Sequence, residues 1–110
     1  MTVVSTLDVA ELTAAEYRKV MDELGVEKRP EGGIYLHLTT PTAGGFRVVE
    51  IWDEKEGFDR FVEQRLAPAS EAVGLERSME ITVTPLHNFF APRLDELPGL
   101  VSALPGAPRR

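Results

Sequence analysis

Apolar positions change their period along the first third of the chain. Residues 2–9 are mostly β-branched or apolar, a composition typical of a strand. From Ala14 the apolar residues recur at i, i+3, i+4 and i+7, which predicts an amphipathic helix. Thr13 and Glu16 have the spacing of a capping box, and Gly25 stands where a left-handed C-terminal cap belongs. The helical positions are Tyr17, Val20, Met21 and Leu24.

A hairpin is predicted after a charged loop at residues 26–33. Two strands, at about 33–40 and 46–53, flank a segment whose two glycines can supply the positive φ values of a tight turn. We expect the turn to lie over Ala43 and Gly44.

The second half of the chain predicts one more helix and one more strand. Asp53 and Glu56 repeat the capping-box spacing, which places a helix directly after the hairpin. Pro68 falls near its end, and residues 69–73 form another turn or a short second segment. Apolar residues then alternate with polar ones in a strand at about 78–87. The helical stripe consists of Phe58, Phe61, Val62 and Leu66.

The resulting order, β-α-β-β-α-β, predicts a ferredoxin-like α+β fold. Right-handed crossovers and hairpin pairing give a four-stranded antiparallel sheet of order 4-1-3-2, with two helices on one face. Residues 1–90 form this domain, and residues 91–110 form a C-terminal appendage with a short helix. The appendage covers the domain's own surface, crosses to a partner subunit, or stays disordered. Its apolar positions are Leu94, Leu97, Leu100, Val101 and Leu104.

Composition and charge narrow the functional classes. The 110 residues give room for one domain, and the lack of cysteine excludes disulfides, thiolate metal sites and a cysteine nucleophile. No basic leader and no apolar run of membrane-spanning length is present, so we expect a cytoplasmic protein without membrane contact. A net charge of −6 disfavours nucleic acid as a partner, because such binding draws on clustered Lys and Arg.

The hairpin register gathers candidate functional residues on one face of the sheet. A two-residue turn pairs His37 with Glu50, Tyr35 with Trp52, and Thr39 with Val48. An exposed aromatic face of this kind indicates a dimer through the sheet, a ligand cleft, or both. The opposite face is expected to lie under the helices, and it carries Ile34, Leu36, Leu38, Val49 and Ile51.

His37 opposite Glu50 is the main candidate for chemistry. A carboxylate at cross-strand distance can orient or charge an imidazole, as in a general acid–base pair. The alternative is a structural pair at an interface. His87 is either a second proton-handling group or a local hydrogen-bonding group. A zinc ion held by both histidines of one chain is disfavoured, because their strands lie at opposite edges of the sheet, so a metal could bind only across two subunits.

The segment from Gly44 to Phe61 resembles the hairpin strand and second helix of dimeric α+β-barrel proteins. It is most similar to the antibiotic-biosynthesis-monooxygenase-like group and its actinobacterial relatives, through the pattern Glu-x-Trp, acidic cap, x-x-Phe. With the closing stretch from Pro85 to Phe90, the similarity covers residues 2–90. It implies a homodimer with a pocket between sheet and helices.

Enzymes of the group that this segment resembles are cofactor-independent oxygenases of polycyclic phenols or haem-degrading monooxygenases. Haem degradation is disfavoured here. The haem branch has an Asn on its first strand and a His near its second helix, whereas this chain has Ser5 and Thr6 and no His between Asp53 and Val73.

We therefore expect a homodimer that binds a small aromatic or polyketide-like molecule without cofactor or metal. The alternative is a non-catalytic dimer with a structural, stress-related or partner-binding role. A ligand beside His37 would favour the first interpretation, and a sheet face packed dry against its partner would favour the second. The catalytic candidates are His37, Glu50 and His87, and the substrate-binding candidates are Tyr35, Trp52 and Asn88.

Overall fold

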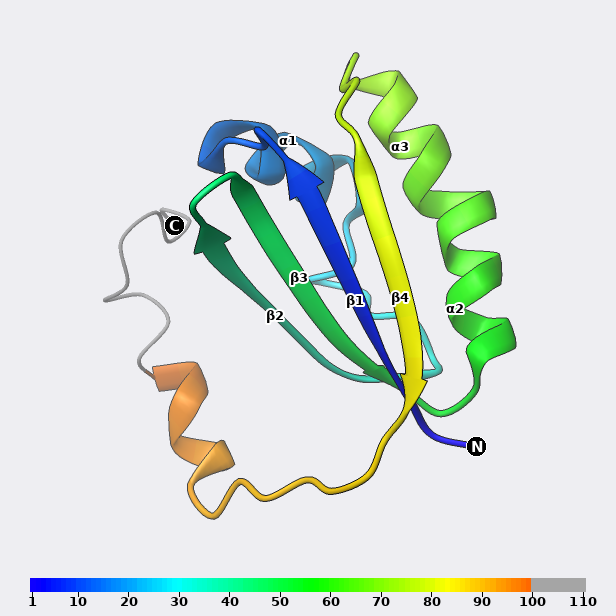
Figure 1. Ribbon diagram of the computed structural model, residues 1–110, viewed down its shortest axis with the longest axis vertical. Coiled ribbons are helices and arrows are strands. Elements are labelled where there is room, and N and C mark those ends of the chain that lie inside the picture. The colour runs from blue at the N-terminus through cyan, green and yellow to red at the C-terminus, as the bar shows by residue number, and fades with distance from the viewer. Residues whose placement is uncertain (100–110) are drawn as a thin grey trace.

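The strands and helices follow one another along the chain in the predicted order, and the strands lie in the predicted order in the sheet. The computed structural model describes residues 1–99. Its antiparallel sheet runs β2-β3-β1-β4, with both helical segments on one face (Figure 1). The α+β ferredoxin-like fold is thereby confirmed. The elements are β1 (Val3–Ala10), α1 (Ala14–Leu24), β2 (Ile34–Thr42), β3 (Gly45–Trp52), α2 (Lys55–Phe61), η1 (Val62–Leu66), α3 (Ala67–Ala72), β4 (Met79–Pro85) and η2 (Leu94–Gly99).

Helix α1 begins and ends as its sequence predicts. The Thr13 side chain accepts a hydrogen bond from the Glu16 backbone N–H, and the Glu16 carboxylate accepts one from the Thr13 N–H. Gly25 has φ 68° and donates to the Met21 carbonyl, which closes the helix. The capping box thus satisfies backbone donors that the first turn leaves free.

The start of α2 differs from the prediction. Glu54 is its N-cap residue and makes no side-chain capping bond. Asp53 stays in the sheet region because its N–H donates to the Gly33 carbonyl, across from the start of β2. The predicted Asp53 cap is therefore wrong: Asp53 still belongs to the pairing with the start of β2, and the helix begins one residue later, after Glu54.

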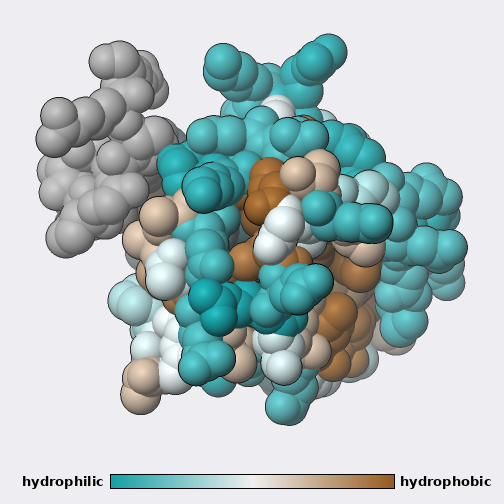
Figure 2. All heavy atoms as spheres, turned by 90° about the horizontal axis from the view of Figure 1, so that it is seen from above, coloured by the Kyte–Doolittle hydropathy of each residue, from teal (hydrophilic) through white to brown (hydrophobic). Residues whose placement is uncertain are grey.

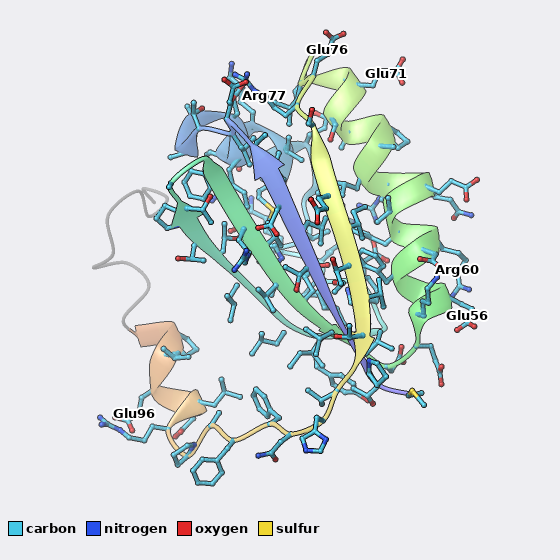
Figure 3. The ribbon with its side chains drawn as sticks, in the orientation of Figure 1. Glu56, Arg60, Glu71, Glu76, Arg77 and Glu96 are labelled. Carbon is cyan, nitrogen blue, oxygen red and sulfur yellow. The ribbon has the colours of Figure 1, made fainter. Side chains whose placement is uncertain are left out.

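The second helix continues through Pro68 into α3, which agrees with the short second segment predicted at residues 69–73. Segment η1 is a π-helical turn, in which the Ala67 N–H bonds the Val62 carbonyl five residues earlier. This wider turn places Phe61 and Leu66, five positions apart, on the inner side of the helix. Figure 3 shows Glu56, Arg60 and Glu71 pointing away from the sheet on the outer side of the same helical segment.

The hairpin register is confirmed over most of its length. Thr42 pairs with Gly45, Thr39 with Val48, and His37 with Glu50. Gly45 has φ 155°, and a Cβ there would lie 2.1 Å from the Val9 carbonyl oxygen, so only glycine fits the turn. The pairing of His37 with Glu50 was therefore predicted correctly from the sequence.

One predicted pair is wrong, because β2 is irregular near its start. Ile34 lies opposite Trp52 and Leu36 lies opposite Ile51, so Tyr35 is the extra residue of a bulge. Tyr35 is 70% exposed. A bulge shifts the alternation by one residue, and counting back from the turn cannot detect it.

From Leu36 to the turn, the two faces of the sheet are the reverse of those expected, whereas Ile34, before the bulge, packs against the core as predicted. Trp52 is 2% exposed and belongs to the core with Val48, whereas Leu38 on the other face is 45% exposed. Strand β1 explains the difference, because its buried Leu7 pairs with Val48 and its buried Val3 pairs with Trp52. Strand β3 is apolar on both faces, so its own alternation could not decide which one the helices cover.

The face of the sheet away from the helices is apolar at its centre. Helices α1, α2 and α3 lie on the other side of the sheet (Figure 1). Threonines surround this centre, and Arg47 pairs with Asp8 near one end. We name its apolar centre the open face; it consists of Val4, Leu36, Leu38, Val49 and Ile51.

The last strand is shorter than predicted and ends at Pro85. Leu86 still donates to the Thr2 carbonyl, after which the chain leaves the sheet and reaches the 3-10 helix η2 (Figure 1). The predicted positions Leu100, Val101 and Leu104 lie outside the described residues. Within residues 1–99, no helix is long and apolar enough to cross a membrane.

Candidate functional site

A chain of hydrogen-bonded side chains runs from α1 to β3 on the helix-covered side of the sheet. The Tyr17 hydroxyl lies 2.7 Å from His37 Nε2, and His37 Nδ1 lies 2.7 Å from Glu50 Oε2. The other oxygen of Glu50 accepts a 3.0 Å bond from the indole N–H of Trp52. Thr39 donates to the Tyr17 oxygen over 2.9 Å. We call these five side chains the polar relay.

The partners of His37 define its tautomer. The Glu50 carboxylate only accepts hydrogen bonds, so it orients Nδ1 as the protonated nitrogen of a neutral ring. Nε2 then accepts the proton of the Tyr17 hydroxyl, whose oxygen in turn accepts from Thr39. In this arrangement the buried carboxylate orients the imidazole, and the imidazole can act as a general base towards a hydroxyl.

Burial keeps Tyr17 a hydrogen-bond donor. Desolvation raises the pKa of the Tyr17 phenol, while the hydrogen bond from Thr39 opposes this in part. The ring stacks beside Phe46, with centroids 6.3 Å apart. The phenol therefore stays protonated at neutral pH and directs its hydrogen at His37.

The core holds the acidic end of the relay in place. Glu50 has a side chain only 7% exposed, and Trp52 packs against Phe58 and Phe61 with ring centroids 5.9 Å and 5.6 Å away. Burying a carboxylate without hydrogen-bond partners costs free energy of folding. Here Trp52 and His37 each bond one of the two Glu50 oxygens. The position of the imidazole is thus set by packed aromatic side chains.

A groove opens on one side of the polar relay. Its volume is about 470 Å³, and it lies between the loop after α1 and the start of β2. His37, Glu50 and Trp52 form its floor, with Tyr35 at its side. It is large enough for a planar ligand of a few rings.

Two arginines fasten the loop that walls the groove. Arg18 pairs with Glu27, and Arg65 pairs with Glu31. Arg65 also donates to the Leu24 carbonyl at the end of α1 over 2.8 Å. These contacts occupy Glu27 and Glu31, two of the three acidic side chains that line the groove. The third, Glu50, bonds His37 and Trp52.

A second, smaller cavity lies on the other side of the polar relay. It has a volume of about 70 Å³ and is lined by side chains of β1, α1 and α3. We call it the apolar chamber. Figure 2, which looks down on the end of the molecule nearest to it, shows hydrophobic side chains gathered there within a hydrophilic rim. Its aliphatic lining includes Leu7, Val9, Val20, Leu24, Leu66 and Leu75.

The structure brings four of the six predicted site residues together. His37, Glu50, Trp52 and Tyr35 all line the groove. His87 and Asn88 lie exposed in the segment after β4, and no described contact joins them to the groove. Their predicted roles stay predictions.

Sequence reasoning missed the role of Tyr17. Tyr17 looked like a core position of an amphipathic helix, yet its hydroxyl reaches strand β2. Period-2 alternation placed Thr39 on the same face as His37, as the structure has it, but gave it no role in the site. Which helix residue would face that row depends on how α1 packs, which no local pattern specifies.

Within residues 1–99, no group of three His, Asp or Glu side chains is arranged to hold a metal ion. The site offers one imidazole, one carboxylate and two hydroxyls, all bonded to one another. The arrangement therefore suits proton transfer to or from an organic ligand.

The fold is similar to that of several solved structures, at low sequence identity. A putative antibiotic biosynthesis monooxygenase from Deinococcus radiodurans aligns with a TM-score of 0.59 at 19% identity, covering 83% of this chain and 97% of that one. SnoaB, a cofactor-independent oxygenase from Streptomyces nogalater, aligns with a TM-score of 0.57 at 14% identity, covering 80% and 94%. The chain has the fold of monooxygenase-like proteins.

The protein Rv0793 from Mycobacterium tuberculosis adds a third structure with the same arrangement. It aligns with a TM-score of 0.57 at 19% identity, covering 82% of this chain and 98% of that one. No protein-family model and no curated protein matches the sequence. The similarity therefore concerns the fold, and any activity must be argued from the polar relay and the groove.

Proposed function

We propose that the protein is a cytoplasmic homodimer that binds a planar aromatic or polyketide-like molecule in the groove and oxidises it without a cofactor. One observation carries the proposal: His37 is held between the Glu50 carboxylate and the Tyr17 hydroxyl at the floor of an aromatic-lined groove. Tyr35, which is 70% exposed at the side of the groove, supplies ring surface for the ligand.

In the proposed reaction His37 is the base. A phenolic hydroxyl or an activated C–H of the ligand takes the place of the Tyr17 hydroxyl at Nε2, and its proton moves to the ring. The Glu50 carboxylate stabilises the imidazolium that forms. The ligand anion then reduces dioxygen. Overall, a CH₂ group and O₂ give a C=O group and water, so the ligand loses four electrons and O₂ accepts them.

The open face supports the dimer. Four of its apolar side chains, Val4, Leu36, Leu38 and Val49, are at least partly exposed in the single chain, whereas Ile51 is already buried. Fully burying a large exposed apolar side chain is worth about 1.5 to 3 kcal/mol. The expected interface is therefore built from Leu36, Leu38 and their neighbours. Val48 and Trp52, which were expected there, belong to the core.

The single tryptophan gives a direct test of ligand binding. Trp52 lies at the groove floor and is the only Trp of the chain. We choose a hydroxyanthrone as a planar, phenolic test ligand, and its binding in the groove should quench the fluorescence of Trp52. Oxygen uptake in the same sample should require no added cofactor.

Variants then separate binding from chemistry. Glu50→Gln should lower the rate of oxygen uptake by about 100-fold, because the base loses its carboxylate, and should change ligand affinity much less. Glu80→Gln, the same change at an exposed position of β4, is the matched control. Ligand binding without oxygen uptake in the wild-type protein would refute the oxidation.

A non-catalytic dimer is the second candidate. Both nitrogens of His37 already have protein partners, as in a purely structural pair. This candidate predicts that Glu50→Gln lowers stability and that no aromatic probe quenches Trp52.

A further inference from the structure

We infer that the apolar chamber is a binding site for dioxygen, adjoining the groove that takes the aromatic ligand. This inference rests on the proposed function, because an oxidation without cofactor needs molecular oxygen as its second substrate. Four observations support it. They are the size of the chamber, its aliphatic lining, the hydrogen bonds that its few polar side chains already make within the protein, and its position beside the groove.

The size of the chamber restricts its occupant. A cavity of about 150 Å³ lined by Leu, Ile and Phe holds benzene or xenon. The apolar chamber has about 70 Å³, which excludes an aromatic ring and admits a diatomic molecule. The two cavities therefore suit two different ligands.

The lining of the chamber disfavours water. An ordered water requires about two to four polar partners. The polar side chains that line the chamber include Tyr17, His37 and Glu50. They already form hydrogen bonds with one another and with Thr39 and Trp52. Ser70, the remaining polar lining residue, adds a single hydroxyl. An apolar molecule loses little by entering such a space.

The position of the chamber links it to the reaction. Met21, Val26, His37, Glu50 and Phe61 line both the chamber and the groove. One layer of side chains thus separates them, and the proposed base belongs to that layer. Dioxygen in the chamber would lie next to the ligand anion that His37 creates.

Methyl NMR of the full-length protein tests the inference directly. Dissolved dioxygen is paramagnetic and relaxes the nuclei near it. Under oxygen pressure, compared with nitrogen, the methyl groups of Leu7, Val20 and Leu24 should relax several-fold faster than those of Leu97, which is 53% exposed. Equal or smaller effects at the buried methyls would overturn the inference.

Filling the chamber should abolish the effect. Val20→Phe places a ring in the space, and Val20→Ile is the milder variant if the larger side chain prevents folding. Val73→Ile adds the same methylene at a half-buried position outside the chamber and is the matched control. The Val20 variants should raise the KM for dioxygen several-fold and leave quenching of Trp52 by the hydroxyanthrone unchanged.

Other outcomes separate the two proposals. Cross-relaxation between water and the chamber methyls would show that water fills the space, and shifts of these methyls on adding the hydroxyanthrone would assign the chamber to the aromatic ligand. Either result overturns the dioxygen site and leaves the proposed function standing. Oxygen relaxation without any aromatic binding would support the site and remove the function on which its role depends.

Discussion

Glu50 Oε2 lies 2.7 Å from His37 Nδ1. The two residues are opposite one another in the hairpin, so this contact joins strands β2 and β3. The carboxylate lies within the core, whereas the imidazole is 26% exposed at the groove. The pair therefore connects the buried interior with the space a ligand can reach. It also sets which nitrogen of the ring is free to act as a base.

Exchange of Glu50 for glutamine should reverse the tautomer of His37. The carboxamide would use its oxygen for the Trp52 N–H and present its NH₂ to Nδ1, so the ring proton should move to Nε2. Nitrogen-15 chemical shifts of the imidazole report the tautomer. An Nδ1–H ring in both proteins would show that the carboxylate does not control the base.

Tyr17→Phe should change how stability depends on alkaline pH. Burial raises the pKa of the Tyr17 phenol above its ordinary value near 10, so folding favours the neutral form. That contribution is fully present below pH 10 and is lost as the pH rises through the folded-state pKa. Urea unfolding between pH 8 and 11 should therefore show a steeper alkaline loss for the wild type. Parallel curves would contradict the assigned burial.

Ser5→Ala should stabilise the protein. Ser5 is fully buried opposite Glu50, and its hydroxyl has no hydrogen-bond partner among the described residues. An unsatisfied buried hydroxyl costs about 1 kcal/mol or more, so the free energy of unfolding should rise by about 1 kcal/mol. Ser78→Ala, at an exposed position, is the control for chemical denaturation. A lower stability in Ser5→Ala would mean that the hydroxyl has a partner.

Leu38→Glu should weaken the proposed dimer without unfolding the domain. Leu38 is 45% exposed on the open face, so a charge there meets water in the monomer but would be buried in the dimer. Sedimentation should show a shift towards the 12.2 kDa monomer. Leu97→Glu, at a similarly exposed leucine of η2, should leave the mass unchanged. Equal masses for wild type and Leu38→Glu would remove the open face as the interface.

Much of the fold follows from local chemistry. The capping box at Thr13, the left-handed Gly25 and the two-residue turn before Gly45 each act within a few residues, so the sequence alone determined α1 and the His37–Glu50 register. Predictions from local sequence were wrong where a residue pairs with one that is distant in sequence. Asp53 pairs with Gly33, so α2 begins one residue later than predicted, and a bulge near Ile34 shifts Tyr35.

The tertiary structure decided which face of the sheet carries the site. Strand β3 is apolar on both sides, and only the pairing of β1 shows that Val48 and Trp52 lie under the helices. The packing of α1 then brings the Tyr17 hydroxyl to His37, and the π-turn η1 turns Leu66 inward. The sequence by itself thus determined the elements, their order and the pair at the centre of the site. The buried face, the tyrosine of the relay and both cavities depend on side chains that meet only when helices pack on the sheet, because such contacts join residues distant in sequence.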